Sequence, residues 1–349
     1  MSQVTSPSVG IIEVTSRGWE RSEQPLRVKE LELLKPVSRS FYISIRLLPK
    51  VLREPVALGY LLARTTDTIA DSSTIDVHKR VELLDRFARA IAGKERGIGQ
   101  DLAQLGGSPG VSDGESALLG SADEILQSLD NLSPEDQRDV RELLAIITRG
   151  QREDLTRWRG PFSALANAEE LRNYTYLVAG CVGEFWTRLC FRKVSSFTPR
   201  GETDMLELGT KYGRGLQLVN ILRDVRRDLE AGRCYFPEDE LREAGLTPAD
   251  LLTAPAAFLP IYQRWIAEAR TGLDAGLEYS IGINPPRVRV ATVLPAMIGI
   301  RTLELIEQSG LEALRTRVKV SRSEVRGMIA STTITLAGQS RLRGIRAKL

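Results

Sequence analysis

Two segments of this chain carry narrow stripes of polar side chains along helices that are otherwise apolar. In the first, residues 56–71, the stripe falls at offsets of 0, 4, 7 and 11 and consists of Tyr60, Arg64, Asp67 and Asp71. At about 100° per residue, these offsets place all four side chains on one helical face. Many of the other positions are apolar, so this helix belongs in a core and carries charge into it.

The second segment, residues 215–229, repeats this design. Its stripe falls at offsets of 0, 3, 7 and 11 and consists of Gln217, Asn220, Asp224 and Asp228. The same arithmetic places them on one face of a helix rich in leucine, valine and isoleucine. A single D-x-x-x-D pair is usually an ordinary solvated helix face. Two pairs with matching polar companions on apolar helices instead favour a shared site.

The chemistry of paired carboxylates suggests what this site binds. Two carboxylates one helical turn apart repel each other in a core unless a cation lies between them. Mg²⁺ takes oxygen ligands, retains waters and is commonly held by one or two carboxylates plus substrate phosphates. The two aspartate pairs are therefore candidate ligands for several Mg²⁺ ions and, through them, for a diphosphate. Positive charge for the departing anion would come from Arg64, Arg223 and Arg227.

The pattern along the chain predicts an all-α bundle, large enough to hold a cavity between its helices. From Val28 onward apolar residues recur at helical spacing, and stretches rich in valine and isoleucine are too few to make a sheet. The segment 97–120 holds seven glycines and is predicted to be a loop. We expect a mobile tail over residues 1–24. Helices are expected over residues 134–157 (after the N-cap Ser133), 168–190, 201–229, 255–281, 286–308 and 321–336.

Composition excludes several kinds of protein. The net charge of +3 gives no indication of a nucleic-acid partner, and none is expected. The only histidine, His78, lies among charged residues and is expected at the surface. Ser-His-Asp or Cys-His catalysis would depend entirely on it, and no zinc-ligand spacing is present. The three cysteines, Cys181, Cys190 and Cys234, are expected to be reduced and buried.

The sequence favours a cytoplasmic protein. Its longest mostly apolar run, residues 290–300, has eleven residues and is too short to span a bilayer. The amino terminus lacks the order of a secretion signal. The last 39 residues carry nine basic and two acidic side chains, a net charge of +7. Such an end could rest peripherally on anionic lipid at the inner face of the membrane, although a solvated helix face and a frayed tail account for the same charges.

Four ordered motifs resemble the squalene and phytoene synthases, which are head-to-head prenyltransferases. They are SRSFYISIRLLP (38–49), YLLARTTDTIAD (60–71), NYTYLVAGCVGEFW (173–186) and QLVNILRDVRRDLEAGRCYFP (217–237). The resemblance covers roughly residues 33–237. It implies one helical isoprenoid-synthase domain, expected over residues 25–337, around a deep cavity, with a basic tail over 338–349. Ser72 replaces a further acidic residue of many relatives, which puts the number of metals in doubt.

The resemblance also assigns roles to individual residues. Metal ligands would be Asp67, Asp71, Asp224 and Asp228. Arg64 and Arg223 match arginines that contact diphosphate, and Tyr174 matches a tyrosine that assists proton removal or carbocation control. Tyr60 matches a residue near the pyrophosphate of the donor substrate. Substrate-binding positions would be Ser38, Arg39, Phe41, Gln217 and Asn220, with Arg227 beside them.

The activity implied is the Mg²⁺-dependent joining of two farnesyl diphosphates through presqualene diphosphate to squalene, with NADPH as hydride donor. Squalene is favoured because DTIAD, VAGCVGEFW and GRCYFP are similar to bacterial members of the family. No local nicotinamide fingerprint is present. Lys193 and Arg200 could meet the phosphates of NADPH, although a plain solvated charge run explains them as well. The alternatives are a dehydrosqualene or phytoene synthase, which performs no reduction, and a non-catalytic scaffold. The oligomeric state stays open.

Two glycines inside the third motif have two explanations. Gly180 and Gly183 interrupt a helical pattern, where each costs about 1 kcal/mol relative to alanine. Their small size could make room for a prenyl tail sliding along the helix, or it could permit close packing against another helix. Both explanations are open at this point.

Overall fold

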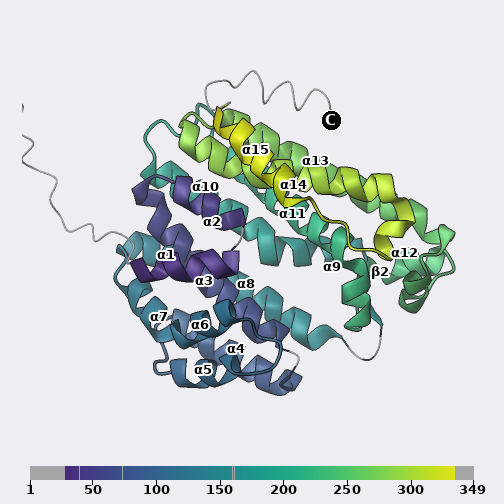
Figure 1. Cartoon of the computed structure of the whole chain (residues 1–349), viewed down its shortest axis with the longest axis horizontal. Coiled ribbons are helices and arrows are strands. Elements are labelled where there is room, and N and C mark those ends of the chain that lie inside the picture. The colour runs from purple at the N-terminus through teal and green to yellow at the C-terminus, as the bar shows by residue number, and fades with distance from the viewer. Residues whose placement is uncertain (1–27, 39, 73, 159, 161, 335–349) are drawn as a thin grey trace, which may run out of the picture.

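The computed structural model is a bundle of helices that describes residues 28–334 except Arg39, Ser73, Arg159 and Pro161 (Figure 1). The helices of its amino-terminal part are α1 (Val28–Ser38), α2 (Ser40–Leu47), α3 (Lys50–Asp71), α4 (Val77–Ile91), α5 (Gly99–Gly106), α6 (Asp113–Gly120), α7 (Ala122–Asp130) and α8 (Pro134–Arg157). The all-α prediction is confirmed. Both predicted tails, residues 1–24 and 338–349, lie outside the described residues.

The carboxy-terminal part contains the longest helix and a small sheet. Its helices are α9 (Ala168–Thr175), a π-helical turn (Tyr176–Gly180), α10 (Cys181–Lys193), α11 (Glu202–Glu230), α12 (Glu238–Glu243), α13 (Leu259–Gly282), α14 (Pro286–Ser309) and α15 (Arg322–Ile334). Three 3₁₀ segments span Pro248–Thr253, Ala256–Phe258 and Gly310–Leu314. The strands β1 (Ser163–Leu165) and β2 (Arg233–Pro237) pair in parallel. The sequence analysis did not predict this pair.

Most predicted helices are present, with shifts at their ends. Ser133 caps α8 as expected, because its Oγ accepts from the backbone N–H of Asp136 at 3.2 Å. The helix predicted over residues 168–190 is interrupted by the π-helical turn, and the one predicted over 255–281 begins as a 3₁₀ segment. Within the described residues, no helix is long and apolar enough to cross a bilayer. His78 is exposed and the three cysteines are buried and unbridged, as predicted.

The predicted loop over residues 97–120 is wrong, because this segment contains α5 and α6. A capping box starts α6, in which Ser112 and Glu115 bond reciprocally to each other's backbone N–H groups. The glycines here permit close packing: a Cβ on Gly106 would lie 3.0 Å from Ser116 Oγ, and one on Gly114 would lie 2.7 Å from Pro36 Cβ. Gly97 and Gly110, in contrast, have positive φ and lie between helices, so the loop rule held for only part of this segment.

Glycines also bring α11 close to α10 and α13. A Cβ on Gly183 of α10 would overlap the backbone of Gly209 on α11, and one on Gly215 of α11 would lie 2.8 Å from the backbone of Gly272 on α13. Real Cβ atoms do not come this close to a neighbouring backbone, so the helices could not approach this way with alanine. Close helix packing thus explains Gly183, and the structure favours it over the alternative of room for a prenyl tail.

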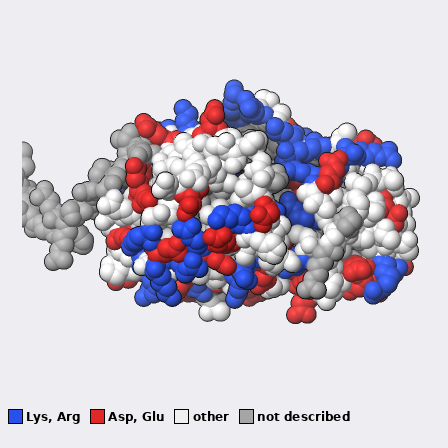
Figure 2. Space-filling model, turned by 90° about the horizontal axis from the view of Figure 1, so that it is seen from below, with Lys and Arg blue, Asp and Glu red and all other residues white. Residues whose placement is uncertain are grey.

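The charged surface is largely internally paired. In the lower part of the face in Figure 2, basic and acidic side chains lie interspersed. Arg86, for example, donates to Glu95 at 2.8 Å and to Asp101 at 2.6 Å. Exposed pairs of this kind contribute about 1 kcal/mol or less each. The fold therefore depends on its apolar core and close helix contacts more than on these pairs.

We expect Gly183→Ala to destabilise the protein by about 1–3 kcal/mol, because the new methyl group must separate α10 from α11. Gly120→Ala is the matched control. A Cβ on Gly120, at the end of α6, has no other atom within 4 Å. That change should be neutral or stabilise by less than about 1 kcal/mol. Urea unfolding followed by circular dichroism measures both, and equal effects would show that the close contact is not rigid.

Candidate active site

The two aspartate motifs lie on α3 and α11, and Arg233 interacts electrostatically with an aspartate of each. Asp71 is the last residue of α3, and Asp224 lies at a kink in α11, where its φ and ψ are −105° and 15°. Arg233 of β2 lies 3.9 Å from Asp228 Oδ1, and the charge of Asp71 also acts on its guanidinium. The fold thus brings the predicted motifs together, with a cation of the protein beside both.

In the first motif, Asp67 is surrounded by polar partners, yet its carboxyl group is partly exposed. Gln151 of α8 donates to Asp67 Oδ1 at 2.5 Å, and Arg64 lies 3.9 Å from Oδ2. Burial among protein atoms, and next the charge of Asp71, raise the pKa of Asp67 to about 6. Yet 47% of its side-chain surface is accessible. The Asp67 carboxyl group is therefore partly exposed, and a ligand can reach it.

In the second motif, the two aspartates have opposite electrostatic surroundings. Burial raises the pKa of Asp228 to about 7, with Arg233 opposing and Asp224 adding to the rise. Burial would also raise the pKa of Asp224, but Arg223 and Arg317 outweigh it and lower that pKa. Arg223 donates to both carboxylate oxygens at 3.0 and 2.6 Å, and Arg317 donates to Oδ1 at 2.9 Å. In this motif, the charge of Asp228 is therefore less compensated by arginines than the charge of Asp224.

The residues predicted beside the first motif occupy one region but have partners of their own. Arg64 forms an ion pair with Glu115 of α6. Tyr60 donates to the carbonyl of Val37 at 3.1 Å, and its ring stacks on Phe41 with centroids 5.7 Å apart. Phe41 is 45% exposed, so this stack offers an apolar surface.

Two other predicted positions near the first motif add little to the site. Ser38 is buried, and its hydroxyl donates to the carbonyl of Leu34 at 2.5 Å. It therefore serves its own helix. Arg39 lies outside the described residues, and its predicted role stays a prediction.

The remaining predicted residues of α11 lie along its polar face. Asn220 Nδ2 donates to Gln217 Oε1 at 3.3 Å, and Asn220 is exposed. Arg227 is exposed as well, and its charge favours the ionised form of Asp228. Gln217, Asn220 and Arg227 are thus at least partly exposed to solvent. The structure is compatible with their predicted contact with substrate, and that contact stays a prediction.

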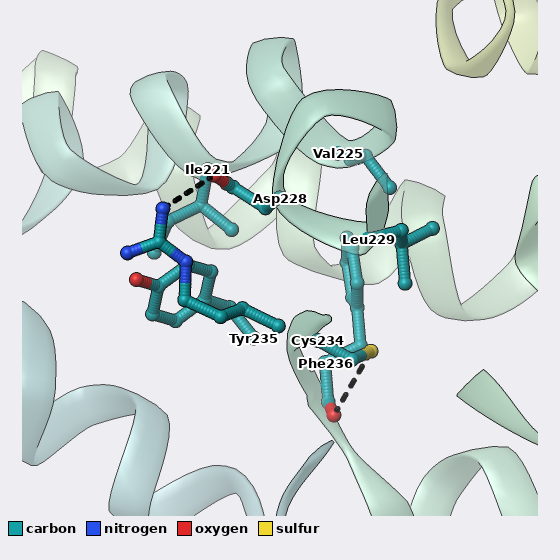
Figure 3. Close-up of a pocket in the computed structure, with 8 residues that line it drawn as sticks. Ile221, Val225, Asp228, Leu229, Cys234, Tyr235 and Phe236 are labelled. Carbon is teal, nitrogen blue, oxygen red and sulfur yellow. Dashed lines mark hydrogen bonds and ion pairs between the residues drawn. The ribbon is translucent and has the colours of Figure 1, made fainter. Parts of the chain in front are cut away.

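Tyr174 lies in a buried cluster with two residues that the sequence analysis did not assign. Its hydroxyl donates to the Tyr235 hydroxyl at 3.3 Å, which in turn donates to Asp154 Oδ2 at 3.1 Å. Burial raises the pKa of Tyr174, and the charge of Asp154 adds to this. Figure 3 shows Tyr235 and Asp228 on a small cavity of about 10 Å³, which is room for one water. Tyr174 is therefore linked to the second aspartate motif through Tyr235.

The two predicted cofactor-binding cations are engaged elsewhere. Lys193, at the end of α10, lies 2.6 Å from the buried Asp136 of α8. Arg200 lies 2.8 Å from Glu278 of α13. Each cation thus has a carboxylate partner, and the structure does not single these residues out for a phosphate-bearing cofactor. Their assignment to NADPH stays a prediction.

Sequence reasoning missed Gln151, Asp154, Arg233 and Arg317. Gln151 and Asp154 continue the buried apolar face of α8 that contains Val140, Leu144 and Ile147, and this spacing was the available signal. Arg233 stood inside the quoted GRCYFP motif, which was the available signal. Arg317 lies 93 residues from its partner Asp224, and no local pattern joins them.

The donor set fits Mg²⁺ shared with a substrate diphosphate. Within the described part of the chain, no three His, Cys, Asp or Glu side chains form a closed metal cage. Pairs of carboxylates suffice, however, for an ion that retains waters and binds phosphate. Several buried polar atoms around the motifs also have no hydrogen-bond partner among the described residues: Gln151 Oε1, Asp154 Oδ1, Arg64 Nε and Arg233 Nε. Such orphans are typical of a site that binds a polar ligand.

Comparison with known proteins points to the same family as the four sequence motifs. A family model described as squalene/phytoene synthase matches residues 34–324. A squalene synthase of Saccharomyces cerevisiae is 27% identical over 338 residues, covering 95% of this chain and 73% of the yeast protein. A ligand complex of TcSQS aligns with a TM-score of 0.70 at 20% identity, covering 91% of this chain and 95% of that one. A ligand-bound dehydrosqualene synthase aligns at 0.61 and 22% identity, covering 88% and 95%.

The shared fold is that of the helical isoprenoid synthases. Because the family model covers most of its length, the chain belongs to the squalene/phytoene synthase family, and it is a prenyltransferase. The resemblance seen in the four motifs is thereby confirmed. The individual site residues rest on the geometry described above.

The opposite pKa shifts in the second motif predict opposite effects of two substitutions on the metal-free protein. Asp228 holds its proton to about pH 7 when folded but only to about 4 when unfolded. Its ionisation therefore costs stability as the pH rises from about 4 to 7. Asp228→Asn should raise the melting temperature at pH 8 and change it little at pH 4.

The matched control is Asp224→Asn, one turn away. The pKa of Asp224 is lowered, so its charge stabilises the fold above the unfolded pKa, and this stability is lost as the pH falls. Asp224→Asn should therefore lower the melting temperature at pH 8. Thermal unfolding in a chelator at both pH values measures the pair. The same sign for both variants at pH 8 would contradict the electrostatic assignment.

Proposed function

We propose that this protein joins two molecules of farnesyl diphosphate head to head through presqualene diphosphate to squalene. The observation that carries the proposal is that Arg233, beside the buried Tyr174 cluster, lies 3.9 Å from Asp228 of the second motif and interacts electrostatically with Asp71 of the first. Similarity to a squalene synthase over 95% of the chain supports the choice of product. The fold similarity to a dehydrosqualene synthase keeps coupling without reduction as the second candidate.

In the first half-reaction, separate residues bind the departing diphosphate, stabilise the allylic cation and act on its proton. Arg64 and Arg233 carry buried N–H groups without partners, which suit the oxygens of a departing diphosphate. Tyr60 and Phe41 present stacked aromatic faces to an apolar chain. Aromatic faces stabilise positive charge, and a dry apolar wall keeps water away from an allylic cation. Tyr174 acts on the proton or the charge of that cation.

The proposed reaction uses Mg²⁺ to assist the loss of diphosphate and NADPH to supply a hydride. Asp67, Asp71, Asp224 and Asp228 would hold Mg²⁺, which when bound neutralises the charge that develops on the leaving diphosphate. NADPH is proposed as the hydride donor because the reaction that ends in squalene must receive a hydride. Lys193 and Arg200 have carboxylate partners in the structure, and no step is assigned to them.

We expect Asp67→Asn and Asp224→Asn each to reduce turnover by more than about 100-fold, because both remove a charge that the transition state requires. Steady-state diphosphate release from farnesyl diphosphate and Mg²⁺ measures this. Asp85→Asn, on α4 and paired with Arg152 at 3.1 Å, is the control and should retain activity. More than a tenth of wild-type activity in both motif variants would overturn the metal-site assignment.

The product is tested by incubating the purified protein with farnesyl diphosphate and Mg²⁺, with and without NADPH, and identifying products by mass spectrometry. Without NADPH we expect presqualene diphosphate to accumulate, and with NADPH we expect squalene. Equal rates of dehydrosqualene formation under both conditions would favour the second candidate. Geranylgeranyl diphosphate in a parallel arm tests whether phytoene is the product instead.

A further inference from the structure

The buried Tyr174 cluster is a chain of three hydrogen-bonding groups from three separate elements. Tyr174 is on α9, Tyr235 is on β2 and Asp154 is on α8. The two tyrosine rings stack with centroids 4.8 Å apart and planes inclined by 22°. The three residues are between 6% and 8% exposed. Packing therefore fixes the hydroxyl groups in place, and water has little access to compete for their hydrogen bonds.

The chemistry of the last group sets the direction of the whole chain. An ionised carboxylate can only accept hydrogen bonds. In the structure the Tyr235 hydroxyl donates to Asp154 Oδ2 at 3.1 Å, and the guanidinium of Arg233 lies 3.6 Å from the same oxygen. Burial raises the pKa of Asp154, and the charge of Arg233 partly offsets this rise. The Tyr235 hydrogen is therefore committed to Asp154, and the Tyr235 oxygen accepts from Tyr174.

This direction leaves the Tyr174 hydroxyl with a defined chemical character. Its single hydrogen is donated to Tyr235, so it is not available to a ligand. Its oxygen retains lone pairs, and the structure shows no donor to them within the described ranges. Such an oxygen can stabilise a positive charge, and it can accept a proton if its own hydrogen moves to Tyr235 and the Tyr235 hydrogen moves to Asp154. It cannot act as a proton donor to a leaving diphosphate while the chain is intact.

We propose that Asp154 and Tyr235 are positioning residues that hold Tyr174 as an acceptor toward the carbocation of the reaction. This inference rests on the proposed head-to-head coupling. A tyrosine at this place could act as an acceptor or as an acid. The hydrogen bonds from Tyr174 to Tyr235 and from Tyr235 to Asp154, which lies outside the two aspartate motifs, favour the acceptor.

The test is a double-mutant cycle on the coupling step. Asp154→Asn keeps the shape but adds an amide that can donate to Tyr235, and Tyr235→Phe removes the middle hydroxyl. Each should lower kcat for diphosphate release by about 10-fold or more and change KM by less than about 2-fold. Tyr235→Phe should cost less than about 2-fold further in a Tyr174→Phe background, because its hydroxyl acts through Tyr174. Asp154→Asn should keep a part of its loss in that background, because it also removes a charge beside Arg233.

The matched control is Tyr262→Phe. Tyr262 is fully buried, and its hydroxyl donates to the carbonyl of Leu222 at 2.8 Å, outside the cluster. Its loss should leave kcat within about 2-fold of wild type and should add to Tyr174→Phe independently. Fully additive losses for Tyr235→Phe in the Tyr174→Phe background would instead show a merely structural role and overturn the inference.

A spectroscopic measurement makes the outcome independent of activity. Ultraviolet resonance Raman spectra of wild type minus Tyr174→Phe report the C–O stretch of Tyr174, which differs between a donating and an accepting hydroxyl. We expect a donor signature that is lost in both Asp154→Asn and Tyr235→Phe. An unchanged signature overturns the inference whatever the activity. A wild type that shows the donor signature but releases no diphosphate contradicts the proposed function and leaves the hydrogen-bond direction standing.

Discussion

The close approach of α11 to α10 and α13 is the constraint on which the arrangement of the site depends. Gly183 faces Gly209, and Gly215 faces Gly272, so backbone meets backbone on two sides of α11. A helix held by backbone contacts has little freedom to slide, because interiors are close-packed and each displacement opens voids. The polar face of α11, with Asp224 and Asp228, is consequently held at a defined place opposite α3. Glycines outside the two polar stripes thus determine where the aspartates lie.

The site places buried charges of both signs close together, and the balance between them is uneven. Arg233 serves Asp228 and Asp154 at distances of 3.9 and 3.6 Å, too long for strong hydrogen bonds. Asp224, in contrast, has two arginines at hydrogen-bond distance. Two arginines thus nearly neutralise Asp224, whereas Arg233 compensates the charge of Asp228 only weakly. A protein that must bind cations and release an anion needs this kind of incomplete pairing, at some cost in stability.

Much of this arrangement could be predicted from the sequence, because helical periodicity is a local property. The stripes on α3 and α11 followed from spacing alone, and Ser133 with Pro134 marked the start of α8. The failures concerned contacts between distant segments. The glycines of α5 and α6 suggested a loop until their neighbours, such as Pro36, were known. Asp154 became meaningful only when folding placed it beside Tyr235, 81 residues later.

The contact of Arg317 with Asp224 has a consequence for how the protein is made. Asp224 belongs to α11, whereas Arg317 lies after α14, and the following helix is tied back to α14 by Arg301 and Glu324 at 3.0 Å. On a ribosome, the carboxylate therefore emerges 93 residues before the arginine that covers it. During that interval the nascent chain exposes a partly paired acidic site. Completion of the last helices is then also the moment at which this site acquires its final electrostatic state.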